Sequence, residues 1–410
     1  MTNYKSGEII AALDIGTSKI CILIAEVVSD GKINILGRGL QDSKGMDKGG
    51  VVDLDLLIRS VQKSLNQAEE LASCQVGSVC LSISGKHISC QNENGMISIN
   101  NKEVTQNDLR NVIHTASSVK LPHERQILHV FPKDYSIDVQ DGIKSPIGMS
   151  GMRMEAKVHM ITCAYDLAEN IVKSTKRCGL NVNHLVFSAI ASSCSVLTDD
   201  EKDLGVCLID IGAGTSDVVV FSGGFVEYSA VLPVAGNQVT SDIAKIFRSS
   251  VLHAESIKLD ILSSDKDVLD EGFVDIPSVS SDTSRSISKK ALMDVIDARY
   301  KEIFRLIHQD LCSKGLSSKI LSGVVLTGGS ASFSGLVNIA ENYFDTPVRV
   351  GNLIGTSFNK DGLDDPKFAT AAGLLSYCTG NTKDDVSFKT GNNSFVGLIS
   401  RAKKWLVGEF

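Results

Sequence analysis

Residues 8–27, EIIAALDIGTSKICILIAEV, are echoed by residues 205–224, GVCLIDIGAGTSDVVVFSGG. Each stretch is an apolar run rich in β-branched residues, then a turn of small residues, then a second such run, which is typical of a β-hairpin. Both turns begin Asp-Ile-Gly and continue to Thr-Ser, so the second is expected to be longer by Ala213 and Gly214. Because internal similarity at this spacing indicates duplication, we expect an α/β fold of two related lobes rather than two unrelated hairpins.

The two turns have the composition of a phosphate-binding site. Glycine lets backbone N–H groups approach a ligand closely, and successive N–H groups in a tight turn attract anions. Hydroxyl donors follow in both turns, at Thr17, Ser18, Thr215 and Ser216. An aspartate opening each turn would repel phosphate unless it holds hydrated Mg²⁺, which needs only one or two carboxylates. We therefore expect the turns to clamp a magnesium nucleotide, with Asp14 and Asp210 facing the metal through water.

A third element is residues 323–344, GVVLTGGSASFSGLVNIAENYF, which predict a buried strand, a Gly328-Gly329 turn and an amphipathic helix. Glycine here would let the backbone lie against a base or a ribose. Two better-known phosphate loops are excluded. No GxxxxGK[ST] motif is present, and Gly212-Ala213-Gly214 fails as a dinucleotide fingerprint because Asp217 replaces the third glycine and a strand follows.

Composition narrows the class of protein. The formal net charge of -7 argues against broad attraction to nucleic acid. The ten cysteines form no CxxC pair, which argues against a metal or thioredoxin-type site, and we expect them to act as small core residues in a reducing cytosol. The N-terminus has no signal-peptide pattern, and no apolar run approaches the roughly 20 residues that span a bilayer.

Two Asp-x-Gly turns followed by a late strand-Gly-Gly-helix resemble the superfamily of actin, sugar kinases and DnaK-type ATPases. In that fold the turns are phosphate loops and Gly-Gly belongs to the adenosine loop. Within it, several segments from about residue 8 to the C-terminus are similar to the FtsA family of bacterial cell-division proteins. These segments are LDIGTSKICILIAEV (13–27), residues 195–224, AGNQVTSDIAKIF (235–247), HAESIKLDIL (253–262), VVLTGGSASFSGL (324–336) and the basic C-terminal tail.

The resemblance implies a set of ATP contacts. The first phosphate loop would be Asp14, Gly16, Thr17, Ser18 and Lys19. The second would be Asp210, Gly212, Gly214, Thr215 and Asp217. Gly328, Gly329 and Ser330 would face adenosine, with Gly236 and Asn237 lining the cleft nearby. Glu255 and Lys258, three apart on an expected helix, would contact the nucleoside, although a surface ion pair is the alternative.

The second loop departs from the family's pattern at one position. That loop often reads Asp-x-Gly-Gly-Gly-Thr, whereas Ala213 holds the middle position here. Asp217 is the candidate for positioning an attacking water. We expect a weak ATPase at most, in a protein whose role is mainly structural.

The same resemblance and the local patterns divide the chain. We expect a lobe 1 core at 1–83 and 163–204, an inserted subdomain at 84–162, a lobe 2 core at 205–239 and 312–378, a small subdomain of lobe 2 at 240–311, a flexible linker at 379–393 and an amphipathic helix at 394–410. Helices are predicted at 55–72, 107–118, 166–178 and 369–378, the second with a capping box of Thr105 and Asp108.

In the family, the small subdomain docks the C-terminal tail of FtsZ, and the matching residues are Arg285, Arg299 and Tyr300. Cations suit an acidic peptide, although solvated surface charges are the alternative.

The tail, SFVGLISRAKKWLVGEF, has Ser394 as a good N-cap. At ~100° per residue, its apolar side chains fall within an arc of about 140° and most of its basic ones lie opposite. The residues expected to bind membrane are Phe395, Leu398, Ile399, Arg401, Lys403, Lys404, Trp405, Leu406 and Phe410. A helix of roughly 24 Å that is half polar lies in the lipid interface rather than spanning the bilayer. A helix packed on the protein's own core is the alternative.

Together these features predict an ATP-binding, actin-like protein that polymerises at the cytoplasmic face of the inner membrane. It would anchor FtsZ filaments, the Z ring, at the division site through anionic lipids, and help recruit later divisome proteins. A small-molecule kinase of the same superfamily is the main alternative, but no substrate motif supports it. A DnaK-type chaperone would need a peptide-binding domain after the nucleotide fold, and a pilus-assembly relative would lack the tail.

Overall fold

The computed structural model describes residues 7–28, 32–262, 272–277, 284–333, 335–354 and 362–379. The membrane helix predicted at 394–410 lies outside these residues, as does the predicted linker apart from Thr379. Within the described part, no helix is long and apolar enough to cross a membrane.

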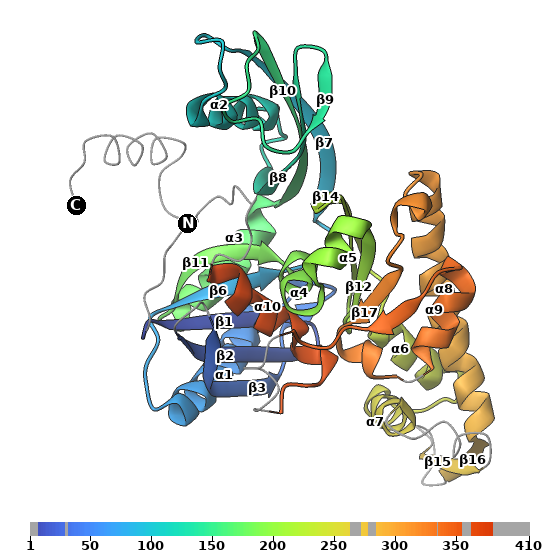
Figure 1. The fold of residues 1–410 in the computed structure, drawn as a ribbon. Coiled ribbons are helices and arrows are strands. Elements are labelled where there is room, and N and C mark those ends of the chain that lie inside the picture. Colours follow the sequence, from blue (N-terminus) through green and yellow to red (C-terminus); the bar gives the residue numbers. More distant parts are fainter. Residues whose placement is uncertain are drawn as a thin grey trace.

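Lobe 1 is built on a five-stranded sheet in the order β11-β6-β1-β2-β3 (Figure 1). Its strands are β1 (Ile9–Ile15), β2 (Lys19–Val27), β3 (Ile33–Asp42), β6 (Ser78–Ile83) and β11 (Asn181–Phe187). The first three form an antiparallel meander, and β6 and β11 add to it in parallel. Its helices are α1 (Leu54–Ala72), α3 (Tyr165–Arg177) and α4 (Ser188–Val196), joined late in the chain by α10 (Ala369–Cys378).

Lobe 2 repeats this topology with the order β14-β13-β12-β17-β18. Its strands are β12 (Val206–Ile211), β13 (Ser216–Ser222), β14 (Phe225–Leu232), β17 (Val324–Thr327) and β18 (Val348–Val350). Again three antiparallel strands are extended by two parallel ones. Its helices are α6 (Gly236–Ile246), α8 (Lys289–Ser313) and α9 (Leu336–Phe344). The predicted duplication of an α/β core is therefore confirmed.

The inserted subdomain stands apart at the top of Figure 1 and has its own small core. Its sheet has the order β7-β10-β8-β9, and helix α2 (Gln106–Ser117) packs on β7 and β10. The strands are β7 (Ser89–Ser98), β8 (Arg125–Ile137), β9 (Gln140–Ile143) and β10 (Arg153–Ala164). The capping box of Thr105 and Asp108 begins α2 as predicted. The subdomain also reaches lobe 2, since Lys133 Nζ lies 2.9 Å from Glu227 Oε2 on β14.

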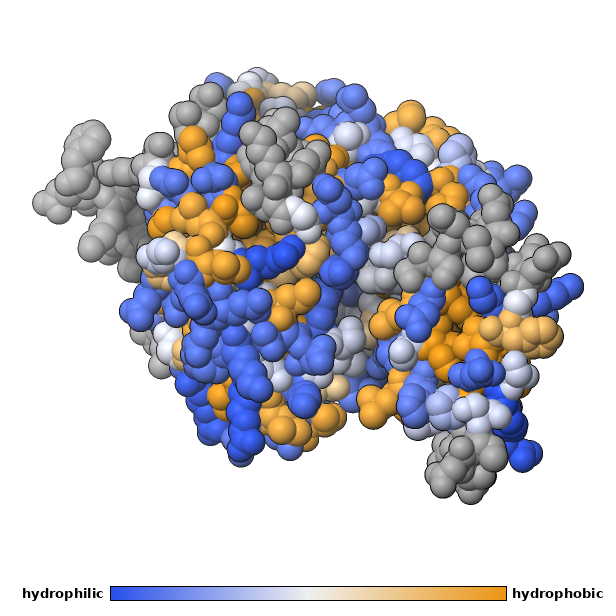
Figure 2. Space-filling view, turned by 90° about the horizontal axis from the view of Figure 1, so that it is seen from below, coloured by the Kyte–Doolittle hydropathy of each residue, from blue (hydrophilic) through white to orange (hydrophobic). Residues whose placement is uncertain are grey.

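The small subdomain of lobe 2 carries α7 (Val251–Leu262) and the hairpin of β15 (Phe273–Pro277) and β16 (Ser284–Ser288). It exposes several large apolar side chains, among them Ile246, Val251, Leu252, Leu259 and Phe273. Figure 2 shows orange residues on this half of the molecule as well as on the other.

The remaining elements are short connections. They are β4 (Met46–Asp47), β5 (Gly50–Val51), α5 (Asp199–Leu204) and the 3-10 turns Ser317–Lys319, Gly329–Ser332 and Pro366–Phe368. Cys80 of β6 and Cys378 of α10 lie side by side with their Cα atoms 6.9 Å apart, although 298 residues separate them in the sequence. The packing of α10 on lobe 1 brings them together.

Candidate functional site

The first turn connects β1 to β2 and combines an aspartate with a lysine. The Gly16 N–H donates to the carbonyl oxygen of Lys19 at 2.9 Å, which closes the turn. The Lys19 ammonium lies 2.9 Å from Asp14 Oδ2, while the Ser82 hydroxyl donates to Asp14 Oδ1 at 2.8 Å. Burial opposes the charged form of Lys19, but the charge and hydrogen bond of Asp14, with contributions from Cys21 and Asp210, together outweigh burial and raise the pKa of Lys19. The first turn is thus internally charge-balanced.

The second turn has the same backbone as the first. The Gly212 N–H donates to the carbonyl oxygen of Thr215 at 2.9 Å, the counterpart of the Gly16 bond. Four residues separate Ile211 from its strand partner Ser216, just as four separate Ile15 from Ile20. The expectation that the second turn is two residues longer is therefore wrong. Strand register aligns Thr215 with Lys19, and the repeated Thr-Ser pair is not at equivalent positions.

The carboxylates of the second turn are buried among hydroxyl groups. Asp210 Oδ2 accepts from the Ser192 hydroxyl at 2.6 Å and from the Thr370 hydroxyl at 3.2 Å. Burial raises the pKa of Asp210 above its ordinary value, and the negative charge of Asp14 adds to the rise. Asp210 therefore has hydroxyl donors in this turn where Asp14 has a lysine.

Asp217 lies opposite Asp210 across the β12–β13 hairpin and is also buried. Its Oδ1 accepts from the Ser84 hydroxyl of lobe 1 at 2.6 Å. Burial and the neighbouring Asp210 raise the pKa of Asp217 well above its ordinary value. The Asp217 carboxyl group is therefore held by a hydroxyl group from the opposite lobe, and it resists ionisation.

The two turns and the Gly328 turn meet at close range. A Cβ atom on Gly214 would stand 2.4 Å from Thr17 Oγ1, so the two turns face each other directly. A Cβ on Gly328, whose φ is +85°, would stand 2.4 Å from Asp210 Oδ1. A Cβ on Gly236 would stand 3.1 Å from Ser330 Oγ. Glycine at these positions permits the convergence of segments that are far apart in the sequence.

The predicted nucleoside residues lie next to the second turn. The Asn237 N–H donates to the Ala213 carbonyl at 2.8 Å, which fixes the start of α6 against the turn. The Lys258 ammonium lies 2.7 Å from Glu255 Oε2, and it donates to Thr240 Oγ1 at 2.9 Å. Lys258 is only 5% exposed whereas the Glu255 side chain is 38% exposed, so the pair has one buried and one accessible partner and is not an ordinary surface ion pair.

Sequence reasoning missed the hydroxyl groups that support this site. These residues are Ser82, Ser84, Ser192, Thr240 and Thr370. Thr240 could have been found, because it lies one helical turn after Gly236 on the same face of α6. The others reach the turns from distant segments, and no local pattern marks them.

The residues predicted to dock a peptide lie on β16 and α8, and they differ in accessibility. Arg285 is exposed and donates to the Phe247 carbonyl at 2.6 Å. The Arg299 guanidinium donates to Asp242 Oδ2 at 2.6 Å and is also paired with Glu302. Tyr300 is fully buried in the lobe 2 core, so its predicted contact with a peptide is corrected. Adjacent helix positions point in different directions, which is why Arg299 reaches the surface and Tyr300 does not.

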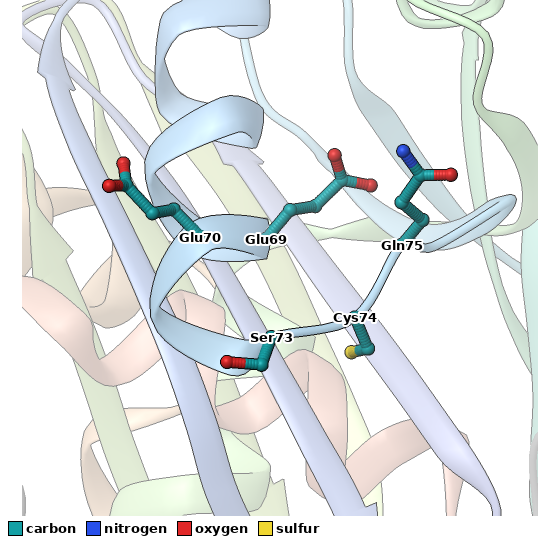
Figure 3. A pocket seen from close by; sticks show the side chains of 5 residues that line it. All are labelled: Glu69, Glu70, Ser73, Cys74 and Gln75. Atoms are coloured by element: carbon teal, nitrogen blue, oxygen red, sulfur yellow. The ribbon is translucent and has the colours of Figure 1, made fainter.

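A hollow of about 520 Å³ at the C-terminal end of α1 is not part of this site. Figure 3 shows the side chains that line it, Glu69, Glu70, Ser73, Cys74 and Gln75, spreading apart instead of converging on one point. Two of them are carboxylates with no basic residue among the lining side chains, which does not suit an anionic ligand.

Comparison with known proteins agrees with this architecture. A family model described as "SHS2 domain inserted in FTSA" matches residues 85–162, and one described as "Cell division protein FtsA" matches residues 207–373. Two relatives named cell division protein FtsA match over the full length of both chains. The one from Escherichia coli K12 is 44% identical over 426 aligned residues, and the one from Pseudomonas aeruginosa is 38% identical over 417.

Solved structures at low identity share the fold. The PilM-PilN type IV pilus biogenesis complex superposes with a TM-score of 0.63 at 15% identity, covering 90% of this chain and 98% of that one. MreB5 of Spiroplasma citri bound to ADP superposes with a TM-score of 0.55 at 14% identity, covering 90% and 95%. The two-lobed actin-like fold with an inserted subdomain is thus confirmed. From the full-length relatives, the chain belongs to the FtsA family of cell division proteins.

Proposed function

We propose that this chain binds ATP with Mg²⁺ between its lobes and acts as an actin-like scaffold of cell division. The observation that carries the nucleotide assignment is the convergence of both turns with the Gly328 turn, at contacts that only glycine permits. N–H groups from two turns suit the phosphates, and the Ser330, Glu255 and Lys258 side chains suit the nucleoside.

The carboxylates fit a hydrated magnesium ion better than direct contact with phosphate. Asp210 is buried with hydroxyl partners, and Asp14 already shares its charge with Lys19. Mg²⁺ keeps several of its waters and is usually held by one or two carboxylates plus phosphate oxygens. Asp14 and Asp210 would hold it through water, and the ion would offset the charge of the triphosphate.

Two further observations favour an adenine nucleotide and slow turnover. Structures of the similarly folded MreB5 contain ADP and AMPPNP. Asp217 is the candidate for positioning the attacking water, but its Oδ1 already accepts a hydrogen bond from the Ser84 hydroxyl at 2.6 Å. The protein would therefore be a weak ATPase, and the bound nucleotide would serve mainly to hold the lobes together.

The scaffold role rests on the tail and on the small subdomain. The amphipathic helix predicted at 394–410 would lie in the cytoplasmic face of the inner membrane and bind anionic lipid, worth roughly 1 kcal/mol per basic residue. Many tails on one polymer would bind far more tightly than one through their effective concentration. The exposed Arg285 and the surface-reaching Arg299 would dock the acidic C-terminal tail of FtsZ, and the polymer would then recruit later divisome proteins.

Sedimentation with vesicles tests the scaffold role. We expect the full-length chain with Mg-ATP to pellet with vesicles containing anionic lipid, and a chain lacking residues 394–410 to remain in the supernatant. A matched pair of variants, Trp405→Glu on the apolar face and Ser400→Glu on the polar face, separates burial in lipid from a general loss of positive charge. Trp405→Glu should abolish pelleting and Ser400→Glu should only weaken it. Equal pelleting of all four chains would contradict the membrane role, and ATP turnover stimulated by a small molecule would favour the kinase alternative.

A further inference from the structure

The hairpin of β4 and β5, residues 46–51, is a segment of lobe 1 that the proposed function leaves without a role. The chain enters it beside the first turn, because the Ser43 N–H donates to the Ser18 carbonyl at 2.9 Å. Its tip lies against the second turn, since a Cβ atom on Gly214 would stand 3.0 Å from the Cα atom of Lys48. This short hairpin therefore bridges the two turns that are assigned to the phosphates of the nucleotide.

Lys48 occupies a position in this hairpin that ordinarily selects other residues. Asp47 pairs with Gly50, so Lys48 and Gly49 form a two-residue connection. Their φ angles are +45° and +78°, the left-handed pair that a type I′ turn requires. Asparagine, aspartate or glycine usually takes the first of these positions, because other side chains are strained in the left-handed region. A lysine held in a strained conformation points to a role for its side chain beyond making the turn.

Close packing holds the tip of the hairpin in place. A Cβ atom on Gly49 would stand 2.2 Å from the Ser84 carbonyl oxygen, so the two backbones are in direct contact. The Ser84 hydroxyl in turn donates to Asp217 Oδ1 of lobe 2 at 2.6 Å. The backbone of Lys48 is thus positioned by lobe 1 on one side and by the second turn on the other.

The Lys48 ammonium is available to a ligand, and the second turn needs a cation. The Lys48 side chain is exposed, and it forms no ion pair or hydrogen bond with the residues that the structure describes. The second turn has the buried carboxyl groups of Asp210 and Asp217, and Thr215 stands where the first turn has Lys19. A phosphate attracted by the N–H groups of this turn would add negative charge beside both carboxyl groups. A cation delivered from lobe 1 would offset that charge.

We propose that Lys48 is a phosphate-binding residue, whose ammonium contacts the phosphate held at the second turn and supplies from lobe 1 the cation that this turn lacks. This assignment rests on the proposed function and deepens it. Lysine binds phosphate as a compact point charge on a flexible side chain, so the ammonium can reach the ligand from a fixed backbone. Because the ammonium belongs to lobe 1 and the turn to lobe 2, the contact would also hold the lobes together around the nucleotide.

Replacing Lys48 by asparagine in the full-length chain separates its role in the turn from its role toward phosphate. Asparagine suits the first position of a type I′ turn better than lysine, so Lys48→Asn should keep or raise the nucleotide-free Tm. Its Kd for Mg-ATP should rise about tenfold, because a charged contact is lost. Lys48→Arg should stay closer to the wild type, because it retains the positive charge. Titration calorimetry measures Kd, and scanning calorimetry without nucleotide measures Tm.

Lys32→Asn is the matched control, because it removes an exposed positive charge from lobe 1 just after β2, at the end of that strand opposite the first turn. It should leave the Kd for Mg-ATP unchanged. If Lys48→Asn binds Mg-ATP as tightly as Lys32→Asn does, the assignment is overturned and the proposed function stands. A joint loss of Tm and of Mg-ATP affinity in Lys48→Asn would also overturn it, since the lysine would then act through the fold. A wild-type chain with no calorimetric response to Mg-ATP would overturn the proposed function and this assignment together.

Discussion

The two turns share a backbone and differ in charge. Each is closed by a 2.9 Å hydrogen bond from a glycine N–H to the carbonyl three residues later, and each follows a strand whose next-to-last residue is an aspartate. In lobe 1, Asp14 faces Lys19. In lobe 2 the equivalent of Lys19 is Thr215, and Asp210 is met by hydroxyl groups.

The same contrast holds two residues further along the chain in each second strand. Cys21 lies opposite Asp14, whereas Asp217 lies opposite Asp210. Lobe 1 therefore presents a balanced pair, and lobe 2 presents two buried carboxyl groups in which the charge of Asp210 disfavours ionisation of Asp217. Duplication preserved the hydrogen bonds that shape the turn, and divergence changed the side chains. A bound cation should accordingly stabilise the second turn more than the first.

The largest effect should come from closing the space beside the second turn. In Gly328→Ala the new methyl group would stand 2.4 Å from Asp210 Oδ1 and 2.6 Å from the Ile211 carbonyl, at a φ of +85° that favours glycine. We expect a loss of roughly 2–4 kcal/mol in the free energy of unfolding, from strain and overpacking together. Unfolding of the variant and the wild type in denaturant measures this loss of stability.

The neighbouring glycine is the matched control for that experiment. A Cβ on Gly329 would meet only Lys367 Cβ, at 3.9 Å, and its φ is not in the left-handed region. Gly329→Ala should therefore cost well under about 1 kcal/mol. Similar losses for both variants would mean that the close approach of the Gly328 turn to Asp210 does not exist in solution.

A smaller loss is expected when the balanced pair of the first turn is broken. Asp14→Asn leaves the Lys19 ammonium, partly buried, without its carboxylate. The expected cost is roughly 1–3 kcal/mol at pH 7. Adding Lys19→Met to Asp14→Asn should recover part of that loss, because the second change removes the stranded charge. A double variant as unstable as the sum of the two single variants would show that the pair is not coupled.

In the second turn, replacing an aspartate is expected to raise the free energy of unfolding instead of lowering it. Because the pKa of Asp217 is raised in the folded protein, the folded state binds a proton there more readily than the unfolded chain does. Stability must then fall as pH rises from about 4, near the pKa of an unfolded aspartate, until pH passes the folded pKa. An asparagine side chain does not titrate, so Asp217→Asn should be more stable than the wild type, by about 1 kcal/mol at pH 8 and less at pH 5. Unfolding curves of both proteins at pH 5 and pH 8 test this prediction. If Asp217→Asn were less stable than the wild type at pH 8, the raised pKa of Asp217 would be contradicted.

The fold was largely predictable because its signals are local. Two hairpins with Asp-Ile-Gly turns, the capping box at Thr105 and helix 369–378 depend on neighbouring residues, and the structure has them where the pattern placed them. The register of the second turn was not predictable from the repeated Thr-Ser pair. Backbone hydrogen bonds, and not identical residue types, determine which residues of the two turns are structurally equivalent.

The site was only partly predictable because its support is non-local. Ser192 and Thr370 reach Asp210 from segments that precede and follow lobe 2, and no spacing rule connects them. Tyr300 was placed at the surface with Arg299 because both follow the family's peptide-docking segment. Its ring instead stacks on Phe333, which comes just after the Gly329–Ser332 turn in a distant part of the sequence.

The smallest expected difference is between two serines at the C-terminal end of β6, Ser82 within the strand and Ser84 just after it. Ser82 donates to Asp14 and accepts from the Ile15 N–H at 3.2 Å, whereas Ser84 donates across the lobes to Asp217. Ser82→Ala should cost about 1–2 kcal/mol, since it loses two bonds and one of them is to an ionised carboxylate. Ser84→Ala should cost only about 0.5–1 kcal/mol, because an Asp217 that resists ionisation offers a weaker acceptor. Unfolding free energies at pH 7 test the order. A larger loss in Ser84→Ala would mean that Asp217 is ionised in the folded protein, and that the second turn is charged like the first but lacks a lysine to balance it.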